Sequence, residues 1–141
     1  MAENFGEVTQ VIGPVLDVSF EKSGIDVPGI YDALEIERQD GSLLVAECQQ
    51  HIGEHTVRAI ALDSTDGLRR GMKVKATGAA IKIPIGSQVR GRLLNVIGEP
   101  IDGMRKLDKT DGYQIHGKAP EYTDLSTQEE ILYTGIKVID L

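Results

Sequence analysis

Apolar and polar residues alternate in short runs through the first 80 residues of the chain. Leu16, Val18 and Phe20 alternate with polar residues, and this period of two is typical of a β-strand with one buried face. Leu34 and Ile36 alternate with glutamates in the same way. Four further runs also predict strands: residues 7–12, 42–48, 57–62 and 73–77. The pattern predicts a mainly β fold in which about six short strands close into a small barrel.

The dipeptide Asp40-Gly41 separates two of these runs. Asp-Gly is favoured in two-residue hairpin turns, because both central residues of such a turn take positive φ. The sequence therefore predicts a tight hairpin with Asp40 and Gly41 at its two central positions.

The pattern changes after Gly78. Residues 81–85 (IKIPI) are mostly apolar but are interrupted by Pro84. Residues 91–102 (GRLLNVIGEPID) predict a strand, a turn at Gly98 and a short return. The part that follows, up to Tyr122, contains several turn-forming residues, so irregular structure is expected there.

Two helix starts are possible near the end of the chain. Ser126 and Glu129 have the spacing of a capping box. Thr134 is the favoured alternative, because residues from Ile136 onward then begin an apolar face. Residues 136–141 (IKVIDL) contain no glycine, asparagine or proline that would end a helix, so the sequence is expected to be a truncated part of a longer chain.

The chain is acidic, with 15 basic and 22 acidic residues and a formal net charge of −7. Affinity for DNA or RNA comes largely from neutralising phosphates with lysine and arginine, so this charge argues against a nucleic-acid partner. Aromatic residues make up only 4% of the chain, which leaves few side chains for stacking on bases.

Neither a secretion signal nor a membrane span is apparent in the sequence. The opening residues (MAENFGEV) lack the basic and apolar regions of a signal peptide. The longest apolar runs have about four residues, against the ~20 that a membrane helix needs. The single cysteine, Cys48, cannot form an internal disulfide, which suits a reducing cytoplasmic compartment. Any membrane contact is therefore expected to be indirect.

Cys48, His51 and His55 have a spacing that resembles half of a zinc site. A structural zinc site needs four ligands, and the sequence supplies no second cysteine. The favoured interpretation is a small core cysteine and two ordinary histidines near a turn, with no metal bound.

The sequence contains one dense basic cluster, formed by Arg69, Arg70, Lys73 and Lys75. Such a cluster is able to hold an anion or to meet an acidic neighbour across a subunit contact. The favoured interpretation is a solvated turn and strand face, because charge runs usually have no other role.

Glu99 and Asp102 could be taken for a general acid and base. They flank Pro100 in a predicted turn, and no apolar pocket that would raise either pKa is evident in the sequence. A structural role is therefore expected for both carboxylates.

Four stretches resemble the catalytic beta subunit of F-type ATP synthases: residues 10–20 (QVIGPVLDVSF), 50–71 (QHIGEHTVRAIALDSTDGLRRG), 91–102 and 134–141 (TGIKVIDL). The stretch at 50–71 is specific to the beta subunit. The last two are shared with related rotary and hexameric ATPases, including the alpha subunit. Departures from the commoner family pattern lie in loops, and the family's own chains are several times longer.

The resemblance implies two parts of a larger subunit. Residues 1–80 are expected to form the β-barrel of the hexamer crown, and residues 81–141 the beginning of an α/β P-loop nucleotide-binding domain. In this family alpha and beta subunits alternate in a hexamer around a central rotor stalk. The beta subunits make ATP from ADP and phosphate, driven by a transmembrane proton gradient. The implied location is cytoplasmic and peripheral, on the inner face of an energy-coupling membrane.

The chain lacks the motif that would hold ATP. The P-loop pattern G-x-x-x-x-G-K-[ST] does not occur in the 141 residues, and the glycine cluster at 67–73 has the wrong spacing. Mg-ATP or Mg-ADP, the ligand of the full-length subunit, is therefore assigned to no residue here. We predict no catalytic, cofactor-binding or metal residue, an inactive segment when isolated, and a main role in hexamer assembly.

Two alternatives stay open at this point. One is a free-standing β-barrel module that binds nucleic acid or a small ligand, which the acidity and the scarcity of aromatics disfavour. The other is the equivalent segment of another hexameric ATPase, such as a V-type or secretion-type relative. The stretch at 50–71 favours the F-type beta subunit over these.

Overall fold

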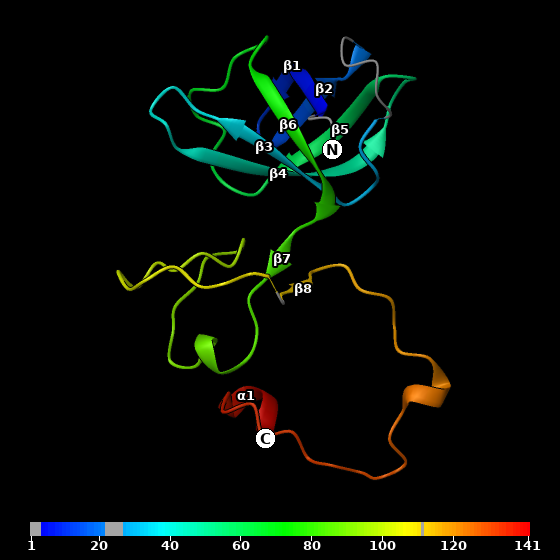
Figure 1. The fold of residues 1–141 in the computed structure, drawn as a ribbon, viewed down its shortest axis with the longest axis vertical. Helices are drawn as coiled ribbons and strands as arrows, with labels where there is room; N and C mark the ends of the chain where they lie inside the picture. Colours follow the sequence, from blue (N-terminus) through cyan, green and yellow to red (C-terminus); the bar gives the residue numbers. More distant parts are fainter. Residues whose placement is uncertain (1–3, 22–26, 111) are drawn as a thin grey trace.

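The computed structural model describes residues 4–21, 27–110 and 112–141 and shows a mainly β fold (Figure 1). Its six barrel strands are β1 (Asn4–Ile12), β2 (Val15–Ser19), β3 (Asp32–Glu37), β4 (Leu43–His51), β5 (Thr56–Ala61) and β6 (Lys73–Ala80). The order around the closed barrel is β1-β2-β5-β4-β3-β6, with antiparallel neighbours throughout. The predicted six-stranded barrel is confirmed, and each predicted run overlaps one strand.

The interior of the barrel is filled by the apolar members of the alternating pairs. Leu16, Val18 and Phe20 are at most 1% exposed, and Leu34 and Ile36 of β3 are fully buried. Each such side chain contributes about 1.5–3 kcal/mol by leaving water. The other strands complete the core with Val8, Leu44, Ala46, Cys48, Val57, Ala59, Ala61 and Val74.

The turn between β3 and β4 differs from the predicted two-residue hairpin. Gly41 has a φ of 80°, but Asp40 does not have positive φ. The amide of Gly41 donates to the carbonyl of Arg38 at 3.0 Å, and the amide of Arg38 donates to the carbonyl of Ser42 at 2.8 Å. This is a three-residue turn, in which only the last position needs positive φ. Asp40 instead accepts hydrogen bonds from the amide and hydroxyl of Ser42.

The chain beyond the barrel has little regular structure. Its elements are short: β7 (Lys82–Ile83), a 3-10 turn at Ser87–Val89, β8 (Tyr113–Gln114), a second 3-10 turn at Tyr122–Asp124 and α1 (Lys137–Asp140). In Figure 1, β7 leads away from the barrel, and the chain after β8 follows an extended path to α1. No helix in the described part of the chain is long and apolar enough to cross a membrane.

Residues 91–102 form an irregular hairpin and not the predicted strand and return. An isolated bridge is the only strand pairing within this fully described range. The side-chain oxygen of Asn95 accepts the amides of Ile97 and Glu99 at 3.1 and 2.8 Å, which replaces a longer ladder. The predicted turn at Gly98 is confirmed by its φ of 72°.

The helix near the carboxyl end has one turn and neither of the predicted caps. No helix begins at Ser126, whose hydroxyl accepts the amide of Gln128 at 3.2 Å. The hydroxyl of Thr134 donates to the carboxylate of Asp140 at 2.7 Å, and the residue at the cap position is Ile136, with no side-chain cap. The predicted helix start at Ser126 is therefore wrong. The favoured start after Thr134 is close to the observed one at Lys137, and the hydroxyl of Thr134 accepts the amide of Ile136 at 3.1 Å, although no side chain caps α1 at Ile136.

Candidate functional site

The outer surface of β1, β2, β5 and β4 carries two adjacent rows of side chains. Each row consists of residues that lie opposite one another on neighbouring strands. The first, polar row contains Gln10, Asp17, Arg58 and Gln50. The second row contains Ile12, Val15, Ile60 and Glu47. Because successive residues point to opposite sides of a strand, both rows face away from the core residues between them. We refer to these residues as the double-row face.

An ion pair with two hydrogen bonds lies in the polar row. Arg58 Nε and Nη2 donate to the two carboxylate oxygens of Asp17 at 2.8 and 2.9 Å. These bonds hold the pKa of Asp17 below its ordinary value and raise the pKa of Arg58. Asp17 is only 6% exposed, and its carbonyl accepts the hydroxyl of Thr9. The barrel wall therefore carries a fixed ion pair in which the two charges neutralise each other.

The second row is apolar for most of its length, and its two isoleucines are open to solvent. Ile12 is 54% exposed and Ile60 is 40% exposed, although both lie in strands. Val15 lies between them in the register and is half-buried. Interfaces between proteins combine such an apolar centre with polar groups that fix orientation. The double-row face is therefore suited to contact with another protein surface.

The outer surface of β1, β6 and β3 carries charges of both signs. The register places Lys73 opposite Glu7 and Lys75 opposite Glu35. Lys73 Nζ also lies 3.5 Å from the centroid of the Phe5 ring. Two lysines of the predicted basic cluster thus face acidic residues across the strands, which favours a charge-compensated surface over an anion site.

The glycine-containing turn between β5 and β6 does not form a phosphate cradle. A cradle needs free backbone N–H groups, usually at the start of a helix. Here a strand follows the turn, and the amides of Leu68, Gly71 and Met72 already donate to carbonyl oxygens. The amide of Arg69 lies 3.2 Å from the sulfur of Met72. These residues do not fit the phosphates of a bound nucleotide.

Cys48 and His51 both contact the carbonyl oxygen of Pro28. That oxygen lies 3.9 Å from Cys48 Sγ and 2.8 Å from His51 Nε2. Cys48 is fully buried, which confirms it as a core residue, and burial raises the pKa of its thiol. His55 lies just before β5, and its carbonyl accepts the amide of Phe20. Among the residues that the structure describes, no group of three or more histidine, cysteine, aspartate or glutamate side chains is placed to hold a metal ion.

Asp102 pairs with Arg92 and not with Glu99. Arg92 Nε and Nη2 donate to its carboxylate at 2.5 and 3.0 Å, and the amides of Met104 and Leu93 donate to it as well. These hydrogen bonds, that of Arg92 foremost, hold the pKa of Asp102 well below its ordinary value. The ionised carboxylate of Asp102 holds the loop together through these hydrogen bonds. It has no proton to donate, which supports the structural role expected for it.

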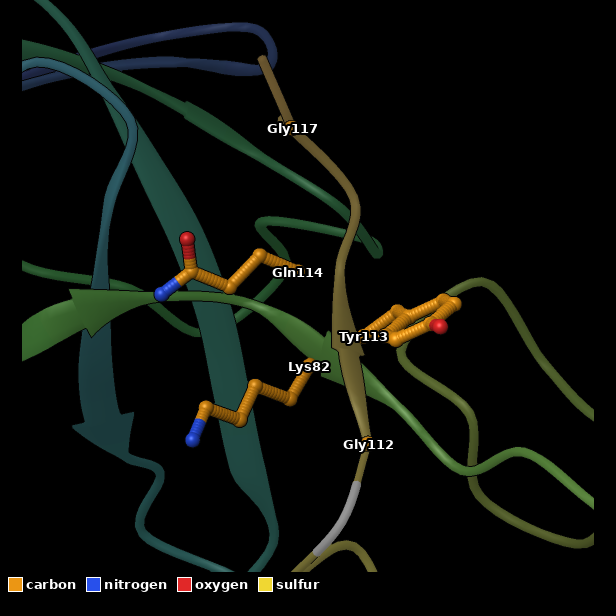
Figure 2. A pocket seen from close by; sticks show the side chains of 5 residues that line it. All are labelled: Lys82, Gly112, Tyr113, Gln114 and Gly117. Carbon is orange, nitrogen blue, oxygen red and sulfur yellow. The ribbon is translucent and has the colours of Figure 1, made fainter. Parts of the chain in front are cut away.

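An open groove of about 450 Å³ runs along β7 and β8 (Figure 2). It is lined by Lys82, Gly112, Tyr113, Gln114 and Gly117. Figure 2 shows the side chains of Lys82 and Gln114 on one side of the paired strands and that of Tyr113 on the other. Lys82 is the one charged residue in this lining, so the groove lacks the convergent polar groups that fix a small ligand.

The double-row face was not predicted from the sequence. The alternating pattern identifies Asp17 as an outward position but does not say which strand lies beside it. Only the strand order β1-β2-β5-β4 brings Asp17 to Arg58 and Ile12 into one row with Ile60. In the sequence, the only indication of this face is an acidic and a basic residue, Asp17 and Arg58, at outward positions of two separate predicted strands.

The barrel also matches a known family. A family model described as "ATP synthase alpha/beta family, beta-barrel domain" matches residues 8–78. The match covers half of the 141-residue chain and reaches from β1 into β6. It includes every residue of the double-row face.

Proposed function

This chain belongs to the ATP synthase alpha/beta family, and we propose that it is the amino-terminal part of the catalytic beta subunit of an F-type ATP synthase. The stretch at residues 50–71 supports the choice of beta over alpha, because its sequence resembles beta subunits specifically. On this proposal residues 1–80 are the barrel domain, and residues 81–141 begin the nucleotide-binding domain.

The role proposed for the barrel is assembly of the hexamer in which alpha and beta subunits alternate. The observation that carries this role is the double-row face. Ile12, Val15 and Ile60 supply apolar area, and the Asp17–Arg58 pair supplies a fixed ion pair beside it. Both rows lie on strands of a closed barrel, so the face is formed before a partner arrives and little ordering entropy is lost on association.

The chemistry of the enzyme is assigned to other parts of the full-length subunit. The proposal places the binding of Mg-ATP or Mg-ADP outside residues 1–141, because the P-loop pattern does not occur in them. The barrels hold the hexamer together around the central rotor stalk, which a transmembrane proton gradient drives. Contact with the membrane is indirect, through the complex, at the cytoplasmic face of an energy-coupling membrane.

Binding to an isolated alpha subunit, followed by sedimentation velocity, tests this function. The wild-type chain is expected to form a complex, and Ile60→Glu to weaken it by about tenfold or more, because the contact would bury an unpaired charge. Ile52→Glu is the matched control. Ile52 and Ile60 are 42% and 40% exposed, but Ile52 lies beyond the end of β4 and outside the double-row face.

Three results would overturn the proposal. If Ile60→Glu binds as tightly as wild type, or if Ile52→Glu binds equally weakly, the double-row face is not the contact. If the chain prefers an isolated beta subunit to an alpha subunit, the assignment as a beta subunit is wrong. Circular dichroism of each variant shows whether the barrel is still folded.

A further inference from the structure

The segment after β8 returns to the outside of the barrel at His116. His116 Nε2 lies 2.9 Å from Oε2 of Glu47 on β4. The His116 ring stacks on the ring of Tyr31, with centroids 4.0 Å apart and 21° between the planes. One residue earlier, the amide of Ile115 donates to the carbonyl of Ile81 at 3.0 Å and so extends the pairing of β7 with β8. The same short segment is thus bonded both to the small sheet and to the barrel.

Glu47 is the partner on the barrel that needs this contact. It lies opposite Ile60 on one side and Ala33 on the other, on the outward side of β4, yet it is only 6% exposed. A buried carboxylate is stable only where its oxygens accept hydrogen bonds. Gln49 Nε2 donates a hydrogen bond to Oε1 of Glu47, and His116 Nε2 lies within hydrogen-bond distance of Oε2. Together these two contacts give each carboxylate oxygen of Glu47 a polar partner.

Tyr31 has a backbone conformation that residues other than glycine avoid. Its φ is 74°, and it is the one non-glycine residue with positive φ in the described part of the chain. Its amide donates to the carbonyl of Cys48 at 2.7 Å, which anchors this conformation to β4. Strain of this kind persists where surrounding contacts determine it, and it concentrates at clamps and switch regions. Here it accompanies the stack on His116.

We propose that residues 112–117 form a latch on the barrel wall, closed by the insertion of His116 between Tyr31 and Glu47. The closed latch fixes β7 and β8, with the groove of Figure 2, beside the barrel. The open latch frees the segment and uncovers Glu47, the end of the second row of the double-row face. This inference is independent of whether that face binds an alpha subunit.

The two ends of the latch are glycines, both visible in Figure 2. A Cβ on Gly112 would lie 2.7 Å from the carbonyl oxygen of Ile83, so only glycine lets the chain pass this close to β7. Gly117 has no atom within 4 Å of its Cβ position. The residues from 113 to 117 are exposed, which is typical of a segment that opens locally while the rest stays folded.

Amide hydrogen exchange on the whole chain tests the latch. His116→Ala is expected to raise the exchange rates at residues 113–115 about tenfold or more, because a hydrogen bond to a buried carboxylate and a ring stack are lost. Barrel amides such as those of Leu34 and Val57 are expected to exchange at wild-type rates. His55→Ala is the matched control, since His55 bonds to the barrel through its backbone.

Variants of Tyr31 separate the latch from a general loss of stability. Tyr31→Phe keeps the ring and is expected to behave as wild type, whereas Tyr31→Gly removes the ring and is expected to open the segment. The double variant Tyr31→Gly, His116→Ala should have exchange rates at residues 113–115 close to those of either single variant, because both substitutions remove the same ring stack. Unchanged exchange at residues 113–115 in His116→Ala would overturn the proposal. Equal acceleration at Leu34 and Val57 would overturn it too, since the effect would then be global.

Discussion

Gly6 shows how closely single residues are packed in the barrel wall. A Cβ added there would lie 2.8 Å from the carbonyl oxygen of Ser19 and 2.9 Å from side-chain atoms of Val18 and Phe20. Val18 and Phe20 are core residues, and Ser19 pairs with β1. None of these atoms can move without disturbing the core or the ladder. Glycine is required at this position by space and not by its φ.

Gly6→Ala is therefore expected to lower the free energy of unfolding by about 1–3 kcal/mol through overpacking. Gly53→Ala is the matched control, because its added Cβ would meet no atom closer than 3.9 Å. It is expected to be neutral or slightly stabilising. Urea unfolding followed by circular dichroism measures both. Equal midpoints for Gly6→Ala and wild type would contradict the close packing.

Asp17 is expected to make the stability of the barrel depend on pH. Its pKa in the folded chain is lowered by the hydrogen bonds from Arg58, so its contribution is complete above the unfolded value of 3.8 and is lost as pH falls through the lower folded value. Asp17→Asn should thus have a lower urea midpoint than wild type at neutral pH, and the difference should shrink below about pH 4.

The control for this experiment is Asp63→Asn. Asp63 lies 3.5 Å from Arg38, and its side chain is 71% exposed. The urea midpoint of Asp63→Asn should therefore depend on pH as that of wild type does. A difference between Asp17→Asn and wild type that stays undiminished in strong acid would show that the ion pair is not its source.

At the scale of the elements, the alternating pattern was sufficient for the barrel strands and insufficient for turns and caps. The strands could be predicted because burying one face of each requires a period of two. Asp40-Gly41 was assigned to the wrong turn, since a dipeptide does not specify the length of the loop around it. The pattern places a helix start at Thr134, and its hydroxyl does accept the amide of Ile136, but the same hydroxyl also donates to Asp140 and α1 begins only at Lys137.

The candidate site was beyond prediction for a different reason. Asp17 and Arg58 are 41 residues apart in the chain, and Glu47 and His116 are 69 apart. These pairs depend on strand order and on the return of a loop to the barrel, and neither leaves a local periodic signal. The resemblance to a family indicated a barrel, but not which residues of its outer surface lie side by side.

At the scale of the whole molecule, the two parts of the chain differ in packing. The six barrel strands lie between Asn4 and Ala80 and enclose one core. In contrast, every residue from 113 to 141 is exposed, and Leu132 and Val138 are 84% and 90% exposed. Barrels of this size are able to fold alone, because their backbone groups pair internally.

Native-state hydrogen exchange is expected to show two regions of different amide protection, with the boundary near Gly78. Barrel amides should open only with global unfolding, and amides from residue 118 onward should exchange at least about 100 times faster, because they lack strand pairing and burial. A chain ending at Ala80 serves as the control and should keep the protection of the barrel. If both parts are equally protected and lose protection in one cooperative transition, they form a single folding unit.

The closed ladder also decides how the barrel responds to mechanical force. β1 and β6 are antiparallel neighbours, and Asn4 at the start of β1 lies opposite Ala76 near the end of β6. Tension applied at Asn4 and Ala80 would separate this pair one hydrogen bond at a time, since the start of β1 and the end of β6 lie at the same end of the ladder. A force applied across the strands, perpendicular to the barrel wall, is instead distributed over all six strands of the closed barrel. A closed barrel of this kind therefore resists a load applied across its strands better than tension applied along its own backbone.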